Sequence, residues 1–403
     1  MTETHTGRQS PITVFIVFLR LGLTSFGGPI AHLGFFREAF VTRLRWLDEA
    51  SYADLVALCQ FLPGPASSQV GIGIGLSKAG LPGALAAWVG FTLPSAVALT
   101  LFGYGVLAVD NAVNVGGLAG LKIAVVAVVA QALWGMGRAL CPDAPRMTLA
   151  VLAAAVVLLV PSAWAQVAVI VGGGVIGALL LKPDSDDGAN GLDVPVSGAI
   201  AGFALAVFFV LLVGLPILAT AFPGQALALT DSFFRAGSLV FGGGHVVLPL
   251  LQSEVVPTGW VGNESFLAGY GAAQAVPGPL FTFAAYLGTV MNEGPNGWLG
   301  ALICLLAIFL PSFLLVIGVL PFWSRLRRHR GLRRGLVGVN AAVVGLLLAA
   351  FYNPVWTSAI RSPAEFVLAL GAFLLLVSWR TPPWLVVLLA GAAGYGLNTW
   401  AIV

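Results

Sequence analysis

The chain has 403 residues, of which 59% are hydrophobic and 9% are charged, with a net charge of +3 and a mean hydropathy of +0.97. A soluble domain carries about 25% charged residues, so this composition excludes a soluble globule. Hydrophobic stretches of about 20 residues, the length that spans a bilayer, recur along nearly all of the chain. We therefore predict an all-α polytopic membrane protein with no nucleic-acid partner.

The chain begins with a short polar leader, MTETHTGRQSP. The apolar segment after it lacks a small-residue cleavage pattern, so we expect no removable signal peptide. Two broken, re-entrant hairpins are predicted first, at 12–36 and 50–79. Four crossing helices follow, near 82–104, 118–136, 147–160 and 164–181. A polar loop at 182–195 and a lone crossing near 196–221 come next.

The remaining residues repeat this order of segments. Two broken hairpins precede crossings near 297–321, 335–352, 364–379 and 383–402. The prediction is about 9 full crossings plus 4 broken hairpin segments, or about 13 hydrophobic segments. We divide the chain into an N-terminal repeat, a polar loop with a linking helix, and a C-terminal repeat, at 1–181, 182–221 and 222–403.

Uncommon residues recur in the same order in the two halves. FLRLGLTSFGGP at 18–29 matches FFRAGSLVFGGG at 233–244 with an offset of 215. With an offset of 214, Trp46 matches Trp260, and the Pro-Gly-Pro at 63–65 matches that at 277–279. Leu-Pro-Ser then follows in each half, at 93–95 and 310–312. Unrelated apolar segments do not share such an order, so the sequence predicts an internal duplication.

The basic residues of short loops indicate how each half is oriented, because they favour the cytoplasm. The loop after the first Phe-Gly-Gly carries Arg37, Arg43 and Arg45, whereas its counterpart at 252–263 carries no Lys or Arg. The loop at 324–334 has six Arg, whereas its counterpart at 105–117 has none. The bias is opposite in both pairs, so we predict inverted halves, a cytoplasmic N-terminus and an outside C-terminus.

Proline and glycine interrupt four of the apolar segments, where backbone is tolerated only if it is buried in protein or lines a polar cavity. Inverted repeats with broken helices are a recurrent transporter design. A helix that starts at Pro29, Pro65 or Pro279 points free N–H groups and a positive dipole end into such a cavity. We expect an oxyanion site there, and structural kinks are the alternative. The predicted contacts are Phe26, Gly27, Gly28, Pro63, Gly64, Pro65, Gly242, Gly243, Gly244, Pro277, Gly278 and Pro279.

Arg20 and Arg235 lie at equivalent places inside apolar helices, before each Phe-Gly-Gly. A buried Arg is costly in a membrane and marks a functional site, and its guanidinium donates two parallel hydrogen bonds to an oxyanion. Snorkelling to the interface or pairing with a carboxylate are the alternatives. Ser67, Ser68 and Gln69 follow the first Pro-Gly-Pro, whereas the residues after the second are mainly apolar. We expect the first break to contact the anion and the second to shape the cavity.

Four further side chains are candidates for proton coupling: His32, His245, Asp54 and Glu38. A packed His, or a carboxylate paired with an Arg, is the alternative for each. The chain has no P-loop and no metal-ligand cluster, and we expect no cofactor. Its three cysteines lie in or beside apolar segments, so we expect neither a disulfide framework nor a metal site.

The ordered set of FGGP, Trp46 and PGP, echoed by FGGG, Trp260 and PGP with LPS after each, resembles the chromate ion transporter family in its long, two-repeat form. The resemblance covers nearly the whole chain and implies chromate efflux across the bacterial plasma membrane, with sulfate as a competing analogue. The second copy departs from the first at Gly244, which stands where the first half has Pro29. The half-helix of the second copy is therefore expected to start differently.

We expect a secondary transporter rather than an enzyme, which exports chromate by alternating access and is driven by membrane potential, proton exchange or both. Sulfate or another oxyanion is the alternative substrate. A membrane-embedded enzyme acting on a lipid phosphate is the second alternative, with the serines and histidines of the breaks as its only candidate groups. The long apolar surface contacts membrane lipid and allows a homodimer.

Overall fold

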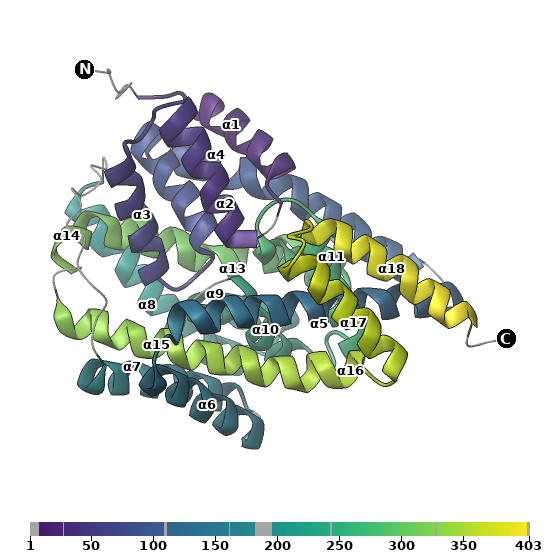
Figure 1. Cartoon of the computed structure of the whole chain (residues 1–403). Helices are drawn as coiled ribbons and strands as arrows, with labels where there is room; N and C mark the ends of the chain where they lie inside the picture. Colours follow the sequence, from purple (N-terminus) through teal and green to yellow (C-terminus); the bar gives the residue numbers. More distant parts are fainter. Residues whose placement is uncertain are drawn as a thin grey trace.

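The structure, a computed structural model, describes residues 8–26, 28–108, 111–160, 162–181, 196–241, 244–326 and 329–400. Gly27, Gly242 and Gly243 of the predicted site lie outside these residues. The described residues form helices joined by loops, which confirms the all-α prediction (Figure 1).

Seven helices and one π-helical turn, η1, make up the first half. They are α1 (Pro11–Thr24), α2 (Gly28–Arg37), η1 (Glu38–Arg43), α3 (Glu49–Phe61), α4 (Ala66–Ala108), α5 (Asn111–Leu140), α6 (Ala144–Leu159) and α7 (Ala163–Leu180). The single helix α8 (Gly198–Ala221) follows, where the sequence predicts a lone crossing.

The second half has the same order of segments with shorter pieces at its breaks. Its elements are α9 (Gln225–Leu239), the 3-10 turn η2 (Gly244–Val246), α10 (Val247–Val255), α11 (Asn263–Ala275), the 3-10 turn η3 (Leu280–Thr282), α12 (Phe283–Thr289), α13 (Gly297–Val319), η4 (Leu320–Phe322), α14 (Trp323–Leu326), α15 (Arg330–Ala350), η5 (Phe351–Trp356), α16 (Thr357–Ala359), α17 (Pro363–Val377) and α18 (Pro383–Trp400).

Side-chain caps define where several helices begin. The Ser10 hydroxyl accepts a hydrogen bond from the Thr13 N–H, and Pro11 opens α1 without losing an intrahelical bond. Asp48 caps α3 in the same way. Ser362 and Glu365 form a reciprocal capping box at the start of α17. These local signals end each loop at a fixed residue.

Helix α4 is interrupted at Ala79 and Gly80, which have non-helical backbone angles. The break divides a first arm, 66–78, from the long helix that follows. The division matches the predicted boundary between the second hairpin and the first crossing. Five described helices are long and apolar enough to cross a membrane, and several apolar helices are shorter. The structure is therefore that of a polytopic membrane protein, while the total of about 9 crossings stays a prediction.

Helices of the two halves exchange packing partners in a reciprocal way. In the first half α1 packs on α4, as α9 packs on α13 in the second. Helices α6 and α7 pack against α15 of the other half, while α17 and α18 pack against α5 (Figure 1). Glycines permit both contacts, because Gly338 meets the Gly173 carbonyl and Gly120 meets the Ala390 carbonyl at backbone distance. The core is thus shared between the halves.

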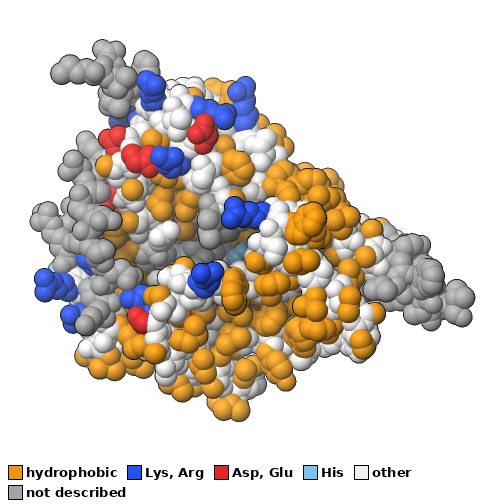
Figure 2. Space-filling view, viewed as in Figure 1, with side chains coloured by type: hydrophobic (Ala, Val, Ile, Leu, Met, Phe, Trp, Pro, Cys, Tyr) orange, Lys and Arg blue, Asp and Glu red, His pale blue; other side chains and the backbone are white. Residues whose placement is uncertain are grey.

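The outer surface is sorted by polarity. Figure 2 shows most of the visible Lys, Arg, Asp and Glu side chains along the upper and left edges and isolated Lys or Arg side chains near the centre, with hydrophobic side chains covering the lower right. Among the charged groups, Arg37 Nε lies 2.7 Å from Glu49 Oε1, which lowers the pKa of the Glu49 carboxyl. An apolar surface of this extent is suited to contact with lipid.

Candidate functional site

The four predicted breaks are present as non-helical backbone between helix ends. Helix α1 ends at Thr24, and α2 begins at Gly28, which has a φ of +77°. Helix α3 ends at Phe61, and α4 begins at Ala66. In the second half, α9 gives way to the 3-10 turn η2, and α11 to the 3-10 turn η3. The first half therefore has α-helical starts where the second half has 3-10 turns.

Backbone hydrogen bonds join the breaks of one half to those of the other. The Gly64 N–H donates to the Val240 carbonyl oxygen at 2.6 Å, and the Gly278 N–H donates to the Ser25 carbonyl oxygen at 3.0 Å. Gly64 and Gly278 correspond by the offset of 214, and Ser25 and Val240 by that of 215. Each Pro-Gly-Pro is thus tied to the residue that ends the first helix of the opposite half.

The two central glycines are required by both backbone angle and space. Gly64 has a φ of +125° and Gly278 a φ of +104°. A Cβ added at Gly64 would lie 2.8 Å from the Ser312 hydroxyl, and one added at Gly278 would lie 2.7 Å from the Ser95 hydroxyl. These serines belong to the Leu-Pro-Ser motifs, each facing the break of the other half. All four motifs therefore converge on one place.

Contrary to the sequence prediction, none of the three prolines is the first residue of a helix. Pro65 and Pro279 are the residues before α4 and η3, and Pro29 is the second residue of α2. Pro65 accepts a hydrogen bond from the Gln69 N–H. The extended conformation of Pro279 suits the cap position, which needs a carbonyl but no helical angles. The N–H groups of 66–68 remain those left free by the helix start.

Buried polar atoms without a partner gather on the residues of these breaks. Ser25 and Ser312 have unpaired hydroxyls, as does Ser68 after the first Pro-Gly-Pro. Gln69 donates to the Pro63 carbonyl oxygen at 2.6 Å, but its own Oε1 is unpaired. The amide nitrogen of Gln274 on α11 is also unpaired. Unpaired buried groups cost about 1–3 kcal/mol each, so the arrangement favours a polar ligand.

The asymmetry between the breaks is present in the structure. Ser67, Ser68 and Gln69 are buried in the first turn of α4. In the second half the Thr282 hydroxyl donates a hydrogen bond to the Pro279 carbonyl oxygen at 2.7 Å, and the neighbouring Phe281 is buried. The sequence did not single out Ser25 or Ser312, although Ser312 stands in a motif that it identified as repeated.

The expectation that Arg20 is buried is wrong. Val14, Phe18 and Gly22 form the face of α1 that packs on α4. Arg20 lies on the opposite face, in register with the exposed Ile16, and its side chain is exposed. The described residues give it no ion-pair partner, so its charge is available to a ligand that reaches this face.

Arg235, at the equivalent place on α9, is paired with carboxylates. Its Nη2 lies 2.8 Å from Asp231 Oδ2 and 3.1 Å from Glu254 Oε2, and its Nη1 lies 3.1 Å from Glu254 Oε1. The Ser232 hydroxyl donates to the same Glu254 at 2.9 Å. The charge of Arg235 is thus neutralised inside the protein, as in the alternative of a structural pair.

The proton-coupling candidates lie in different surroundings. His32 is buried beside the first break, with Nε2 3.1 Å from the Ser25 carbonyl oxygen and Nδ1 3.4 Å from the Ser67 hydroxyl. His245 Nδ1 lies 2.9 Å from the Tyr270 hydroxyl. Its Nε2 is 3.9 Å from where a Cβ on Gly28 would stand, so both histidines adjoin the convergence of the breaks.

The two candidate carboxylates contact other parts of the protein than the histidines do. Asp54 Oδ1 accepts a hydrogen bond from Trp323 Nε1 at 3.0 Å, which joins α3 to α14. Glu38 is exposed on η1 and pairs with Arg43 at 2.9 Å. Phe26, the remaining predicted contact, is partly buried, and its ring lies 6.0 Å from that of Trp384 on α18.

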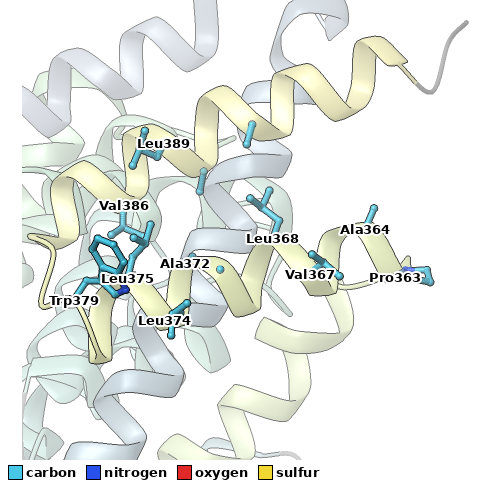
Figure 3. Close-up of a pocket in the computed structure, with 13 residues that line it drawn as sticks. Pro363, Ala364, Val367, Leu368, Ala372, Leu374, Leu375, Trp379, Val386 and Leu389 are labelled. Atoms are coloured by element: carbon cyan, nitrogen blue, oxygen red, sulfur yellow. The ribbon is translucent and has the colours of Figure 1, made fainter.

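Two cavities lie outside this convergence. One, of about 1110 Å³, is a groove between α17 and α18 whose visible lining is aliphatic apart from Trp379 (Figure 3). A dianion would lose its hydration there without gaining a hydrogen bond, so the groove does not suit an oxyanion. The other, of about 440 Å³, has polar lining from Ser162, Gln166, Gln252 and Asn353.

Known proteins of similar sequence are transporters. A chromate transport protein of Pseudomonas aeruginosa is 28% identical over 393 residues, covering 95% of this chain and 91% of the relative. A chromate transport protein of Cupriavidus metallidurans is 26% identical, covering 99% and 95%. An uncharacterized transporter of Methanocaldococcus jannaschii is 26% identical, covering 84% and 83%. No solved structure matches the chain significantly.

The family model described as chromate transporter matches the chain twice, at residues 12–178 and 227–395. The two matches cover most of the chain and contain all four breaks, Arg20 and Arg235. The family consists of transporters and not of enzymes. This finding argues against the alternative of an enzyme that acts on a lipid phosphate. The chain belongs to the chromate transporter family.

Proposed function

We propose that the protein exports chromate from the cytoplasm and binds it where the four breaks converge. The observation that carries the proposal is the reciprocal pair of bonds, Gly64 N–H to Val240 and Gly278 N–H to Ser25, set among unpaired buried hydroxyls and amides. Tetrahedral oxyanions accept hydrogen bonds on every oxygen, so the unpaired donors here fit them: the hydroxyls of Ser25, Ser68 and Ser312 and the amide nitrogen of Gln274. Three relatives are named for chromate transport, which favours chromate within this class.

The first half supplies most of the proposed anion contacts. The free N–H groups at the start of α4 belong to a 13-residue arm, 66–78, whose dipole points at the break. Ser67, Ser68 and Gln69 add side-chain donors there. In the second half the 3-10 turn η3 leads into α12, a helix of only 7 residues. The backbone at Gly27, Gly28, Gly242, Gly243, Gly244 and Pro277 is proposed to line the rest of the site.

Alternating access follows from two inverted halves in this proposal. Helices α6 and α7 pack on α15, and α17 and α18 pack on α5, so each half holds the outer helices of the other. A movement that opens one side then closes the equivalent contacts on the opposite side.

Membrane potential supplies enough free energy for export. Moving one charge through 100 mV is worth about 2.3 kcal/mol, so a dianion that leaves an interior-negative cell gains about 4.6 kcal/mol. That gain corresponds to roughly a thousandfold concentration ratio. Sulfate uptake against the same field would need more than two co-transported cations. We therefore place the protein in the plasma membrane as an exporter, with sulfate or another oxyanion as the alternative substrate.

Flux through purified protein in liposomes tests this function. We expect chromate flux to saturate with concentration and to rise as an imposed potential favours movement of the dianion. Sulfate, molybdate and phosphate added with chromate separate the candidate substrates by their competition. Flux that does not saturate, or that matches protein-free liposomes, would contradict the proposal. Stronger inhibition by sulfate than by unlabelled chromate would favour the alternative substrate.

A further inference from the structure

A charged cluster in the second half has no counterpart in the first. It consists of Asp231 and Arg235 on α9 and Glu254 on α10, with Arg235 contacting both carboxylates at 2.8–3.1 Å. The side chains of the two acids are 11% and 16% exposed. At the matching places in the first half, the offset of 215 puts Ile16 opposite Asp231 and Ala39 opposite Glu254. The cluster is therefore not a general feature of the repeat.

The charges of this cluster do not balance when every group is ionised. Two carboxylates face one guanidinium, which leaves one negative charge within an apolar protein. An unbalanced buried charge is expensive, and binding one proton removes it. Asp231 and Arg235 then remain as a neutral pair at 2.8 Å. Glu254 lines a small pocket beside the cluster and Asp231 is not among the residues that line it, so Glu254 is the carboxyl that a proton from this pocket reaches. The cluster can therefore bind one proton.

A small pocket, whose lining is half polar and half apolar, lies beside the cluster and next to the second cavity. A pocket of about 10 Å³, room for a single water, is lined by Arg235 and Glu254 together with Gln166 and Ser253. Gln166 and Ser253 also line the cavity of about 440 Å³ between α6, α10 and α15. Gln166 is 6% exposed, and its Oε1 has no partner among the described residues, so a residue that lines both spaces carries an unpaired acceptor.

No other titratable group among the described residues contacts Glu254. Helix α10 packs against α7, α9, α11 and α15, and the described part of α7 carries no titratable side chain. On α11, Glu264 pairs with Lys122 at 3.1 Å, and Tyr270 bonds to His245 on η2. The arginines of α15 lie in its first turns, at 330–334, whereas the cavity is lined by 346–350. Arg235 is therefore the charged group that contacts Glu254, with Asp231 on the other side of Arg235 and the Ser232 hydroxyl as a neutral donor to Glu254.

We propose that Glu254, held by Arg235 and lining the same small pocket as Gln166, is the proton-binding site that couples proton movement to oxyanion transport. The proposal rests on the proposed transport function. A proton that arrives from this pocket adds to the Glu254 carboxylate and gives the neutral acid, and the reverse step returns it. Protonation weakens the two bonds from Arg235 that tie α10 to α9. Helix α9 precedes the second Phe-Gly-Gly in the chain and α10 follows it, so the charge of Glu254 acts on the two helices next to the proposed anion site.

The Glu254→Gln variant in proteoliposomes tests the proposal. With one proton exchanged per chromate, the chromate ratio of the wild type shifts about tenfold per unit of pH gradient, because both correspond to about 1.4 kcal/mol. We expect the variant to keep chromate–chromate exchange without a gradient and to lose this shift. The matched control is Glu264→Gln, an exposed acid on α11, which should keep both. A tenfold shift that survives in Glu254→Gln overturns the proposal.

Infrared difference spectroscopy of the purified protein gives a readout that is independent of transport. A pH step should produce the C=O band of a protonated carboxyl in the wild type and in Glu264→Gln, but not in Glu254→Gln. The same band in all three proteins overturns the proton site. Absence of any chromate flux in the wild type would instead contradict the proposed function, and the infrared band would still decide whether Glu254 binds a proton.

Discussion

Arg20 and Arg235 show how the same residue acquires two roles in two halves. Both stand six residues before a Phe-Gly-Gly on the first helix of their half. Arg235 faces Asp231 and Glu254, which neutralise it, whereas Arg20 is exposed and has no carboxylate at the matching positions. A free guanidinium attracts an anion, and a neutralised one does not. We therefore propose that Arg20 attracts the anion and that the cluster of Arg235 binds the proton.

Replacing Arg20 tests the first of these roles. We expect Arg20→Ala to raise the KM for chromate by about tenfold, because it removes an exposed positive charge that attracts the dianion toward the breaks. Arg20→Lys should stay close to the wild type, since it keeps the charge. Arg8→Ala removes an exposed cation just before α1 and serves as the control. An unchanged KM in Arg20→Ala would contradict the assignment.

The sequence identified the two unusual arginines, but it did not predict what surrounds each of them. Arg20 and Arg235 are identifiable because Arg is rare in apolar segments. Which face of α1 packs on α4 is decided by tertiary contacts, so the exposure of Arg20 could not be derived. The signal for the cluster was partly visible, because Asp231 precedes Arg235 by four residues and shares its helix face. Glu254 reaches them from another helix, which no local pattern indicates.

At the scale of the elements, the breaks depend on glycines, because a side chain at these positions would meet both an unfavourable backbone angle and close neighbours. Gly64 has a φ of +125° and donates to Val240, while Gln69 Nε2 and Ser312 Oγ would lie 2.5 and 2.8 Å from an added Cβ. The segment must therefore stay non-helical for the opposite half to dock. The pattern of Pro-Gly-Pro predicts an interruption, but not the partner to which its N–H is bonded.

The Gly64→Ala variant tests this role of the break. We expect a loss of about 1–3 kcal/mol of stability from backbone strain, together with lower flux. Thermal unfolding in detergent and liposome flux measure the two effects. Gly34→Ala is the matched control, because Gly34 lies within α2 and nothing is within 4 Å of its added Cβ. If both variants unfold alike, the break does not depend on the conformation of Gly64.

At the scale of the whole molecule, the two halves are interlocked by equivalent contacts. Gly120 meets α18 as Gly338 meets α7, and each Pro-Gly-Pro bonds to the opposite half. The sequence predicted the order of segments because hydrophobic runs and rare residues mark them locally. It could not predict that α6 and α7 leave α5 to pack on α15. Helix pairing in membranes depends on which small residues allow close approach in space, and small residues are common throughout this chain.

The opposite orientation of the halves is the central claim, and labelling of single cysteines tests it most directly. Leu44 and Thr258 are exposed, correspond by the offset of 214 and follow the matching short helices of the two halves. Leu44→Cys and Thr258→Cys are placed separately in a chain whose buried Cys59, Cys141 and Cys304 are replaced by Ala. A membrane-impermeant maleimide applied to intact cells should label Thr258→Cys and not Leu44→Cys, and inverted vesicles should give the reverse. Labelling of both from the same side would contradict the inverted arrangement.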